Sequence, residues 1–186
     1  MSMVPVQFGP GSGPERSGYA NDGVLINCFA EPSEGEKVSY ALYTAPGLSS
    51  FTTFASGTVR GRFKLGSTLY VVCGETLFKV TSGGTSSTIG TVLGSLPITA
   101  ASNRKSPYQQ VFIVADNNYY VLENDTLTEM TDSDLPSGGH SVAGLDGYIV
   151  VGFASGIFHW SAINDANAWD ALDFAEAEAK SDFLVR

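Results

Sequence analysis

Acidic and aromatic side chains that could do chemistry gather in the stretch FHWSAINDANAWDALDFAEAEAK, residues 158–180. The stretch holds three aspartates and two indoles: Asp165, Asp170, Asp173, Trp160 and Trp169. Two carboxyls at a defined separation could cleave a glycosidic bond. The indole rings could stack on a sugar or fill a core. Short acidic side chains could instead accept backbone N–H groups inside a turn.

Other residues suited to chemistry are sparse along the chain. His140 and His159 stand apart, and two isolated histidines rarely build a metal site. Cys28 and Cys73 lack a CxxC or metal-ligand spacing, so we expect two free thiols in a reducing, cytosolic setting. The glycine-rich start lacks the Gly-Lys-Ser/Thr of a phosphate loop. We therefore expect no catalytic residue, no cofactor and no metal.

Composition narrows the class of protein. The chain has 186 residues, of which 43% are hydrophobic and 21 are glycine, with a net charge of −9. This mix favours a folded, turn-rich, β-rich protein. The negative charge argues against phosphate binding, although an acidic surface could border a channel through which DNA slides; ordinary solubility charge is the alternative. The sequence shows neither signal-peptide features nor an apolar run long enough to span a membrane.

The N-terminal part predicts an arm followed by short strands. Residues 1–23 are expected to form an extended arm, because residues 5–23 are rich in Gly, Pro, Asn and Asp. Alternating residues then predict strands at Val24–Phe29 and Ser39–Thr44. The Pro46-Gly47 pair that follows marks a turn.

Three later segments repeat one pattern: STLYVVCGETLFKVTSGG, QQVFIVADNNYYVLENDT and DGYIVVGFASGIFHWSAIND. Each reads as an apolar strand, a tight turn and a second strand, in a repeat of roughly forty residues. The turns are predicted at Gly74-Glu75, at Asp116-Asn117-Asn118 and at Ala154-Ser155-Gly156. Five flanking strands are also predicted, at Val59–Leu65, Ile98–Ser102, Ser141–Leu145, Ser87–Val92 and Thr126–Thr131.

About four strands in each repeat predict an all-β fold built from β-propeller blades. We expect about three to four blades over residues 24–186. A β-sandwich is the alternative, but it would not need the internal similarity. Because propellers normally have four to eight blades, we expect an incomplete propeller that continues in a longer protein. One short helical turn is expected near Ala175–Lys180, where helix propensity is high.

Four segments, in order, carry a resemblance to a known family: LINCFAEP, YTAPGLSSF, GRFKLGSTLYVVCGETLFKV and VAGLDGYIVVGFASGIFHWSAINDANAWDALDFAEAEAKSD. Together they resemble the N-terminal portion of the packaged-DNA stabilisation family, the tail hub proteins of short-tailed bacteriophages. The last segment is the most specific, with its Leu-Asp-Gly-Tyr and Trp-Asp-Ala-Leu-Asp-Phe-Ala steps. The glycine- and proline-rich arm departs from the family pattern, and the family's later blades are missing.

The resemblance implies a structural virion protein and not an enzyme. Such a protein is a β-propeller that joins a ring oligomer beneath the portal and adaptor proteins of the phage head. It extends the channel, helps to close the capsid after packaging and docks the tail needle or further tail parts. DNA would pass without sequence-specific binding, and assembly would take place in the host cytoplasm. The alternative is a carbohydrate-binding or glycan-cleaving propeller module.

The acidic stretch now has a structural interpretation. Ser161, Asn164, Asp165 and Trp169 resemble the Asp-box turn of many propellers, in which a hydroxyl, an acid and a trailing aromatic stabilise a hairpin. Short Asn and Asp side chains accept backbone N–H bonds there, and the aromatic ring packs on the blade. We interpret these four residues as a structural turn, with glycan cleavage and sugar stacking kept as alternatives.

Overall fold

The computed structural model describes residues 26–32, 40–54 and 57–176, and every regular element in these ranges is a β-strand. The predicted arm at residues 1–23 lies outside the described residues. No helix in the described part is long and apolar enough to cross a membrane. The chain divides into two compact units, Met1–Ser50 and Phe51–Arg186.

The described part of the first unit is one antiparallel hairpin. It pairs β1 (Cys28–Pro32) with β2 (Tyr40–Thr44). The rings of Phe29 and Tyr43 lie 5.9 Å apart on paired residues. The first strand begins at Cys28, later than the predicted Val24. Cys28 is a half-buried free thiol.

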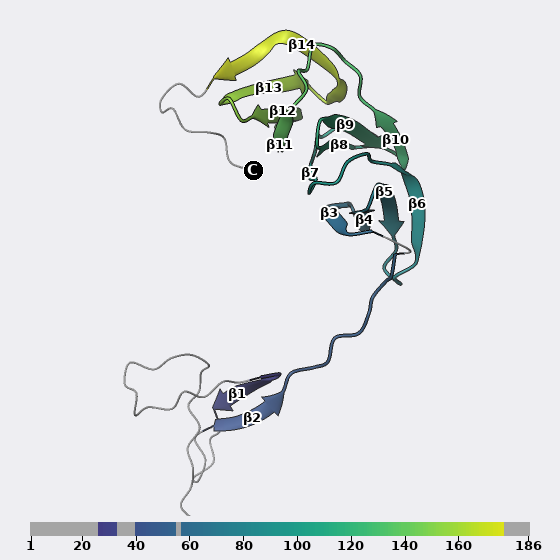
Figure 1. Cartoon of the computed structure of the whole chain (residues 1–186), viewed down its shortest axis with the longest axis vertical. Helices are drawn as coiled ribbons and strands as arrows, with labels where there is room; N and C mark the ends of the chain where they lie inside the picture. Colours follow the sequence, from purple (N-terminus) through teal and green to yellow (C-terminus); the bar gives the residue numbers. More distant parts are fainter. Residues whose placement is uncertain (1–25, 33–39, 55–56, 177–186) are drawn as a thin grey trace, which may run out of the picture. The chain divides into compact units, whose positions relative to one another are not determined.

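The second unit contains three four-stranded antiparallel sheets, each a meander in chain order (Figure 1). The first sheet consists of β3 (Val59–Leu65), β4 (Thr68–Cys73), β5 (Thr76–Val80) and β6 (Ser86–Thr91). The second consists of β7 (Thr99–Ser102), β8 (Gln110–Ala115), β9 (Asn118–Glu123) and β10 (Thr126–Glu129). The third consists of β11 (Gly139–Leu145), β12 (Tyr148–Phe153), β13 (Ile157–Ala162) and β14 (Asp165–Glu176). The predicted all-β fold of blade-like sheets is confirmed.

The central hairpin of each sheet turns where the repeat predicted it. The β4–β5 turn contains Gly74, the β8–β9 turn contains Asp116, and the β12–β13 turn contains Gly156. These three residues have positive φ angles of 57°, 53° and 90°, a backbone conformation that glycine and aspartate tolerate best. Local turn chemistry thus suffices to place the hairpins.

Two local expectations differ from the structure of the described residues. Ala175 and Glu176 continue β14, where they pair with Phe158 and Ile157, and residues 177–180 lie outside the described residues. Helix propensity is a weak preference that strand pairing overrides here. The strand predicted at Ser141–Leu145 begins two residues earlier, so His140 lies within β11 at a bulge, and its Nδ1 is 2.8 Å from the carbonyl oxygen of Gly152.

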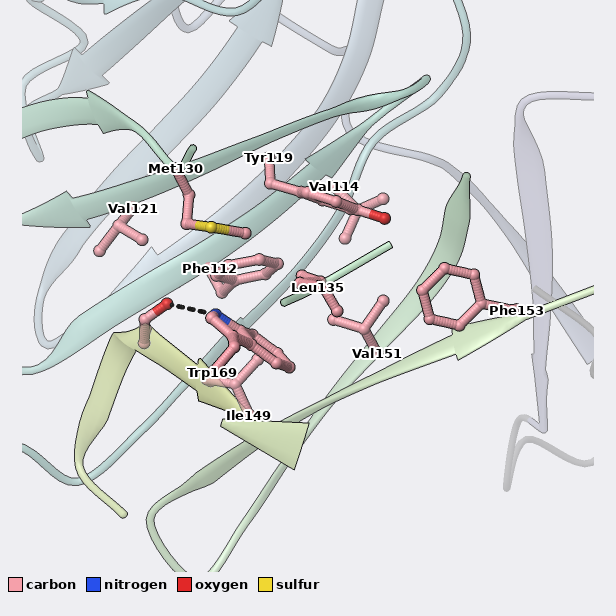
Figure 2. Close-up of a cluster of buried hydrophobic side chains, with 11 residues drawn as sticks. Phe112, Val114, Tyr119, Val121, Met130, Leu135, Ile149, Val151, Phe153 and Trp169 are labelled. Atoms are coloured by element: carbon pink, nitrogen blue, oxygen red, sulfur yellow. Dashed lines mark hydrogen bonds between the residues drawn. The ribbon is translucent and has the colours of Figure 1, made fainter. Parts of the chain in front are cut away.

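The core lies between neighbouring sheets. All six residues of β8 are buried, because alternate side chains face the first and the third sheet. Val111 and Ile113 pack in one cluster with Tyr70 of the first sheet. Phe112 and Val114 pack in the other cluster, with residues of the third sheet (Figure 2). The thiol of Cys73, on β4, is also buried.

Candidate structural site at the junction of the second and third sheets

The four residues of the predicted turn come together where β13 leads into β14. Ser161 lies near the end of β13, just before the turn. Asn164 lies in the turn itself and has a φ of 55°. Asp165 begins β14, and Trp169 lies opposite Ser161 in the ladder. The ladder shifts its register here, which leaves backbone groups for side chains to satisfy.

Ser161 supplies one such side chain. Its fully buried Oγ accepts the backbone N–H of Ile149 at 3.0 Å and donates to the carbonyl of Ala162 at 2.9 Å. One hydroxyl therefore ties β13 to β12 next to the irregular part of the sheet. A buried N–H left without a partner would destabilise the fold, so the hydroxyl has a structural use.

The carboxylates of this stretch bond to the backbone just ahead of them. Asp165 Oδ1 accepts the N–H of Asn167 at 3.1 Å, and Asp170 Oδ1 accepts the N–H of Leu172 at 2.9 Å. Both bonds span two residues, as in Asx-turns, and both are exposed to solvent. The two acids are thus engaged in local turn geometry.

Trp169 is the anchor of the junction. Its side chain is 7% exposed, and its ring centroid lies 5.4 Å from that of Phe112 on the second sheet. Its Nε1 donates to the carbonyl of Ala166 at 3.0 Å (Figure 2). Its backbone N–H donates to Asp132 Oδ2 at 3.2 Å, which fastens the segment that enters the third sheet. A ring buried in this way has no face left for a sugar, so sugar stacking on Trp169 was wrong.

Trp160 occupies a different environment. It pairs with Val150, whereas Trp169 pairs with Ser161, so the two indoles lie on opposite faces of the third sheet. Trp160 is half-buried, and its ring centroid is 6.2 Å from that of Phe158. The structure therefore separates two indoles that the sequence places nine residues apart.

Gln110 is a second anchor, which sequence reasoning missed. Its fully buried Oε1 accepts the amide of Asn103 and the backbone N–H of Ala166, both at 2.8 Å. Its Nε2 donates to Glu123 Oε2 at 2.9 Å, and Lys105 pairs with the same carboxylate. The bonds from Lys105 and then from Gln110 lower the pKa of Glu123. The only sequence signal was a polar residue opening the apolar strand QVFIVA.

Arg60 holds the preceding junction. Its guanidinium is buried and donates to the carbonyls of Leu96 and Val92, both at 2.8 Å. Weaker bonds reach Gly74 and Leu93, and Asp116 Oδ2 lies 3.9 Å from Nη2. Arg60 thereby joins the first sheet, the segment that leaves it and the central turn of the second sheet.

A polar cluster crosses the same junction at the opposite end of the strands. The hydroxyl of Tyr70 donates to Asp125 Oδ1 at 2.6 Å, and Lys79 forms an ion pair with Asp125. The bonds from Lys79 and then Tyr70 lower the pKa of the Asp125 carboxyl. Both junctions are therefore closed by polar contacts around an apolar centre. No cluster that could hold a metal occurs among the described residues.

The sequence matches the family model described as "Bacteriophage P22 Gp10, beta-propeller" over residues 2–185. No curated protein matches the sequence.

Two solved structures are similar to the chain at low sequence identity. The Neurospora crassa Pan2 WD40 domain is 10% identical at a TM-score of 0.40, with 64% of this chain and 35% of that chain covered. A chain of a Mitotic Checkpoint Complex structure is 9% identical at a TM-score of 0.43, with 80% and 51% covered. The chain thus spans about half or less of the length of these two structures.

Proposed function

The chain belongs to the phage family described as "Bacteriophage P22 Gp10, beta-propeller", and from this membership we propose that it is a tail hub, a head-to-tail connector of the virion. In this role it helps to close the capsid after DNA packaging and docks further tail parts. The observation that carries the proposal is the family match over residues 2–185, on a chain whose described part is built of blade-like sheets.

The junctions between sheets support a mechanical role. A connector has to keep its shape while it carries load from the packaged head. Here each junction combines an apolar centre with buried polar anchors, Arg60 at the first and Gln110 at the second. Breaking either junction would leave buried polar groups without partners, which is costly. The buried polar anchors therefore favour neighbouring sheets that move as one body.

The charge distribution supports a channel wall that does not hold DNA. The net charge is −9, and the chain has ten Lys and Arg residues. Among the described cations, Arg60, Lys79, Arg104 and Lys105 already form ion pairs with acidic side chains. Phosphate binding needs basic groups that can release counterions, so DNA is expected to pass without sequence-specific binding.

The carboxylates of residues 158–180 support a non-enzymatic role. Asp165 and Asp170 accept backbone N–H bonds in local turns, and Trp169 is buried in the junction. A glycosidase would need two carboxyls facing a shared cleft, one of them with a raised pKa. No observation on these residues favours the carbohydrate module over the virion protein.

The partners in this proposal are other copies of the chain in a ring, the portal and adaptor proteins on the head side, and the needle or further tail proteins on the distal side. In this proposal the protein is located in the virion tail, and the tail is assembled in the cytoplasm of the bacterial host.

The test compares phage particles assembled with and without this chain. Nuclease-protected DNA is measured after packaging, and the particles are imaged by electron microscopy. We expect particles that lack the chain to lose packaged DNA and to carry no distal tail. Addition of the chain should restore protection. Particles with fully protected DNA and complete tails in the absence of the chain would contradict the proposal.

A further inference from the structure

The edge strand β6 closes one side of the first sheet and carries no charge (Figure 1). Within the described residues it pairs only with β5. Residues 81–96, which contain β6 and both of its flanks, include neither a charged residue nor a proline. Soluble proteins commonly protect edge strands with charge, proline or shortness, so this edge is open to a further strand.

The corresponding edges of the other two sheets are protected. β10 has four residues and ends in Glu129. β14 carries acidic side chains along its length: Asp165, Asp170, Asp173 and Glu176. Of these three edge strands, only β6 combines a length of six residues with an uncharged sequence. The sheets of this unit stack through their faces, so a further sheet in the stack would not cover the edge of β6.

A hollow of about 220 Å³ lies beside the end of β6, between this strand and β10. The residues that line it are Gly90, Thr91, Leu93, Tyr120, Leu127 and Glu129. Leu93 is 45% exposed, whereas Tyr120 is buried and its hydroxyl accepts the N–H of Leu93 at 3.0 Å. Small-molecule pockets measure about 300–1,000 Å³, so this hollow suits a single side chain better than a whole ligand.

Packing of β6 on β10 places the edge next to the hollow. A Cβ atom at Gly90 would lie 3.0 Å from Leu127 Cδ2, so the backbone of β6 comes very close to this side chain. Ile89, which the β5–β6 ladder leaves unpaired at a shift of register, packs with Leu127 against the core between the first two sheets. A strand added along β6 would therefore pass beside the hollow.

Two carboxylates border the hollow. Glu129 lines it, and Glu75 Oε1 accepts the N–H of Gly94, the residue after Leu93, at 3.4 Å. In the part of the chain that the structure describes, neither glutamate forms an ion pair. A basic side chain at this position would be attracted to both, because the two negative charges are not neutralised by a neighbour.

We propose that β6 accepts an extended segment of another protein as an added strand. The hollow takes an apolar side chain of this segment, and a Lys or Arg two residues away faces Glu129. In this mode of recognition, backbone bonds along the edge supply affinity, and a pocket beside the edge supplies specificity. Residues two apart in a strand share one face, so both side chains can reach the hollow. A second copy of this chain is the less suitable occupant, because both copies have a net charge of −9.

The proposed surface goes beyond the tail hub function and does not rest on it, because binding is measured with the purified chain. The probes are labelled nine-residue peptides of Thr and Ser that carry one apolar residue and one Lys two positions away. Fluorescence anisotropy with the full chain should give micromolar dissociation constants. Replacing the apolar residue of the peptide by Ser should weaken binding at least about tenfold, since one buried side chain is lost.

Methylation of the peptide backbone identifies strand addition. Alternate N–H groups of a strand face its neighbour, so N-methyl groups placed one at a time should weaken binding with a period of two residues. Each methyl group on the bonded side should cost at least about tenfold in affinity. An even loss along the peptide, or no loss at any position, would overturn strand addition.

A matched pair of variants locates the contact. Leu93→Gln alters the wall of the hollow and should weaken binding about tenfold. Leu96→Gln replaces an apolar residue of similar exposure outside the lining and should bind as the wild type does. Glu129→Gln should weaken the Lys peptides but leave unchanged the affinity of peptides with Gln in place of Lys.

Three further results would overturn the proposal. The first is that none of the peptides binds at about 1 mM, the weak limit of a specific contact. The second is equal binding by Leu93→Gln and the wild type. The third is self-association of the chain in sedimentation that Leu93→Gln abolishes, because a second copy would then occupy the edge. Circular dichroism checks the folding of each variant, and the two peptide series decide the matter with the wild type alone if Leu93→Gln does not fold.

Discussion

The Oε1 atom of Gln110 accepts the backbone N–H of Ala166 at 2.8 Å, and this bond joins the second sheet to the third. Gln110 begins β8, a strand whose six residues are all buried, and Ala166 lies on β14 three residues before Trp169. The side-chain amide oxygen of Gln110 therefore accepts a backbone N–H of the next sheet, as the backbone carbonyl of a neighbouring strand would. This makes the junction specific in a way that apolar contact alone does not.

Replacing Gln110 should destabilise the fold. Gln110→Leu removes the acceptor for the Ala166 N–H and for the side-chain amide of Asn103. It also removes the donor to Glu123 Oε2. We expect the free energy of unfolding to fall by about 1–3 kcal/mol, the cost of a buried unsatisfied group. Urea unfolding measures the change. The neighbouring exposed Gln109 is the control, and Gln109→Leu should change stability by less than about 0.5 kcal/mol. Equal effects of the two variants would contradict the junction role.

Arg60 and Arg62 make a matched pair on β3, one buried and one exposed. Arg60→Met removes charged donors from the carbonyls of Leu96 and Val92. Bonds to a charged group contribute about 1.5–3 kcal/mol, and we expect a loss of that size in thermal or urea unfolding. Arg62→Met should have little effect. If both variants unfold like the wild type, Arg60 does not hold the first junction.

Trp169 and Asp165 should differ in their contribution to stability. Trp169→Ala removes a packed ring and should cost about 3–5 kcal/mol. The bond that Asp165 accepts is exposed, so Asp165→Ala should cost only about 0.5–1.5 kcal/mol. Both changes should lower the melting temperature and the yield of phage particles together, with the larger effect for Trp169→Ala.

A glycan panel tests the enzymatic alternative directly. Wild type and Asp165→Ala are compared at equal folded concentration, and we expect no turnover of any glycan by either. Turnover by the wild type that disappears in Asp165→Ala, at unchanged stability, would mean that the carboxylate acts in catalysis.

His159 should make stability depend on pH. Its ring lies 5.5 Å from the rings of both Phe153 and Phe174, and burial lowers the pKa of its imidazole. The unfolded chain binds a proton below a pKa of about 6.5, whereas the native state binds it only at lower pH. Stability is therefore lost as pH falls from about 7 to about 5. His159→Phe should flatten this slope in urea titrations at several pH values. An unchanged slope in His159→Phe would sink the prediction.

The strands and hairpins could be predicted from the sequence because their causes are local. Alternation of apolar residues sets which side chains share a face, and Gly74 and Asp116 tolerate the positive φ that tight turns need. The strand Val59–Leu65 was predicted with the bounds that it has, and the three central turns were placed correctly. The family resemblance also rests on local segments, and the family match confirmed it.

The roles of individual side chains depended on contacts between residues far apart in the chain. Trp160 and Trp169 are the same residue type in one stretch, yet Trp169 is buried against Phe112 and Trp160 lies half-buried on the opposite face of the third sheet. Gln110 reaches Ala166 across 56 positions, and Arg60 reaches Val92 across 32. Alternation along a strand defines two faces but not which of them a neighbouring sheet will cover. That is decided when the sheets stack, because burial and the loss of water from a polar group arise only where two surfaces meet.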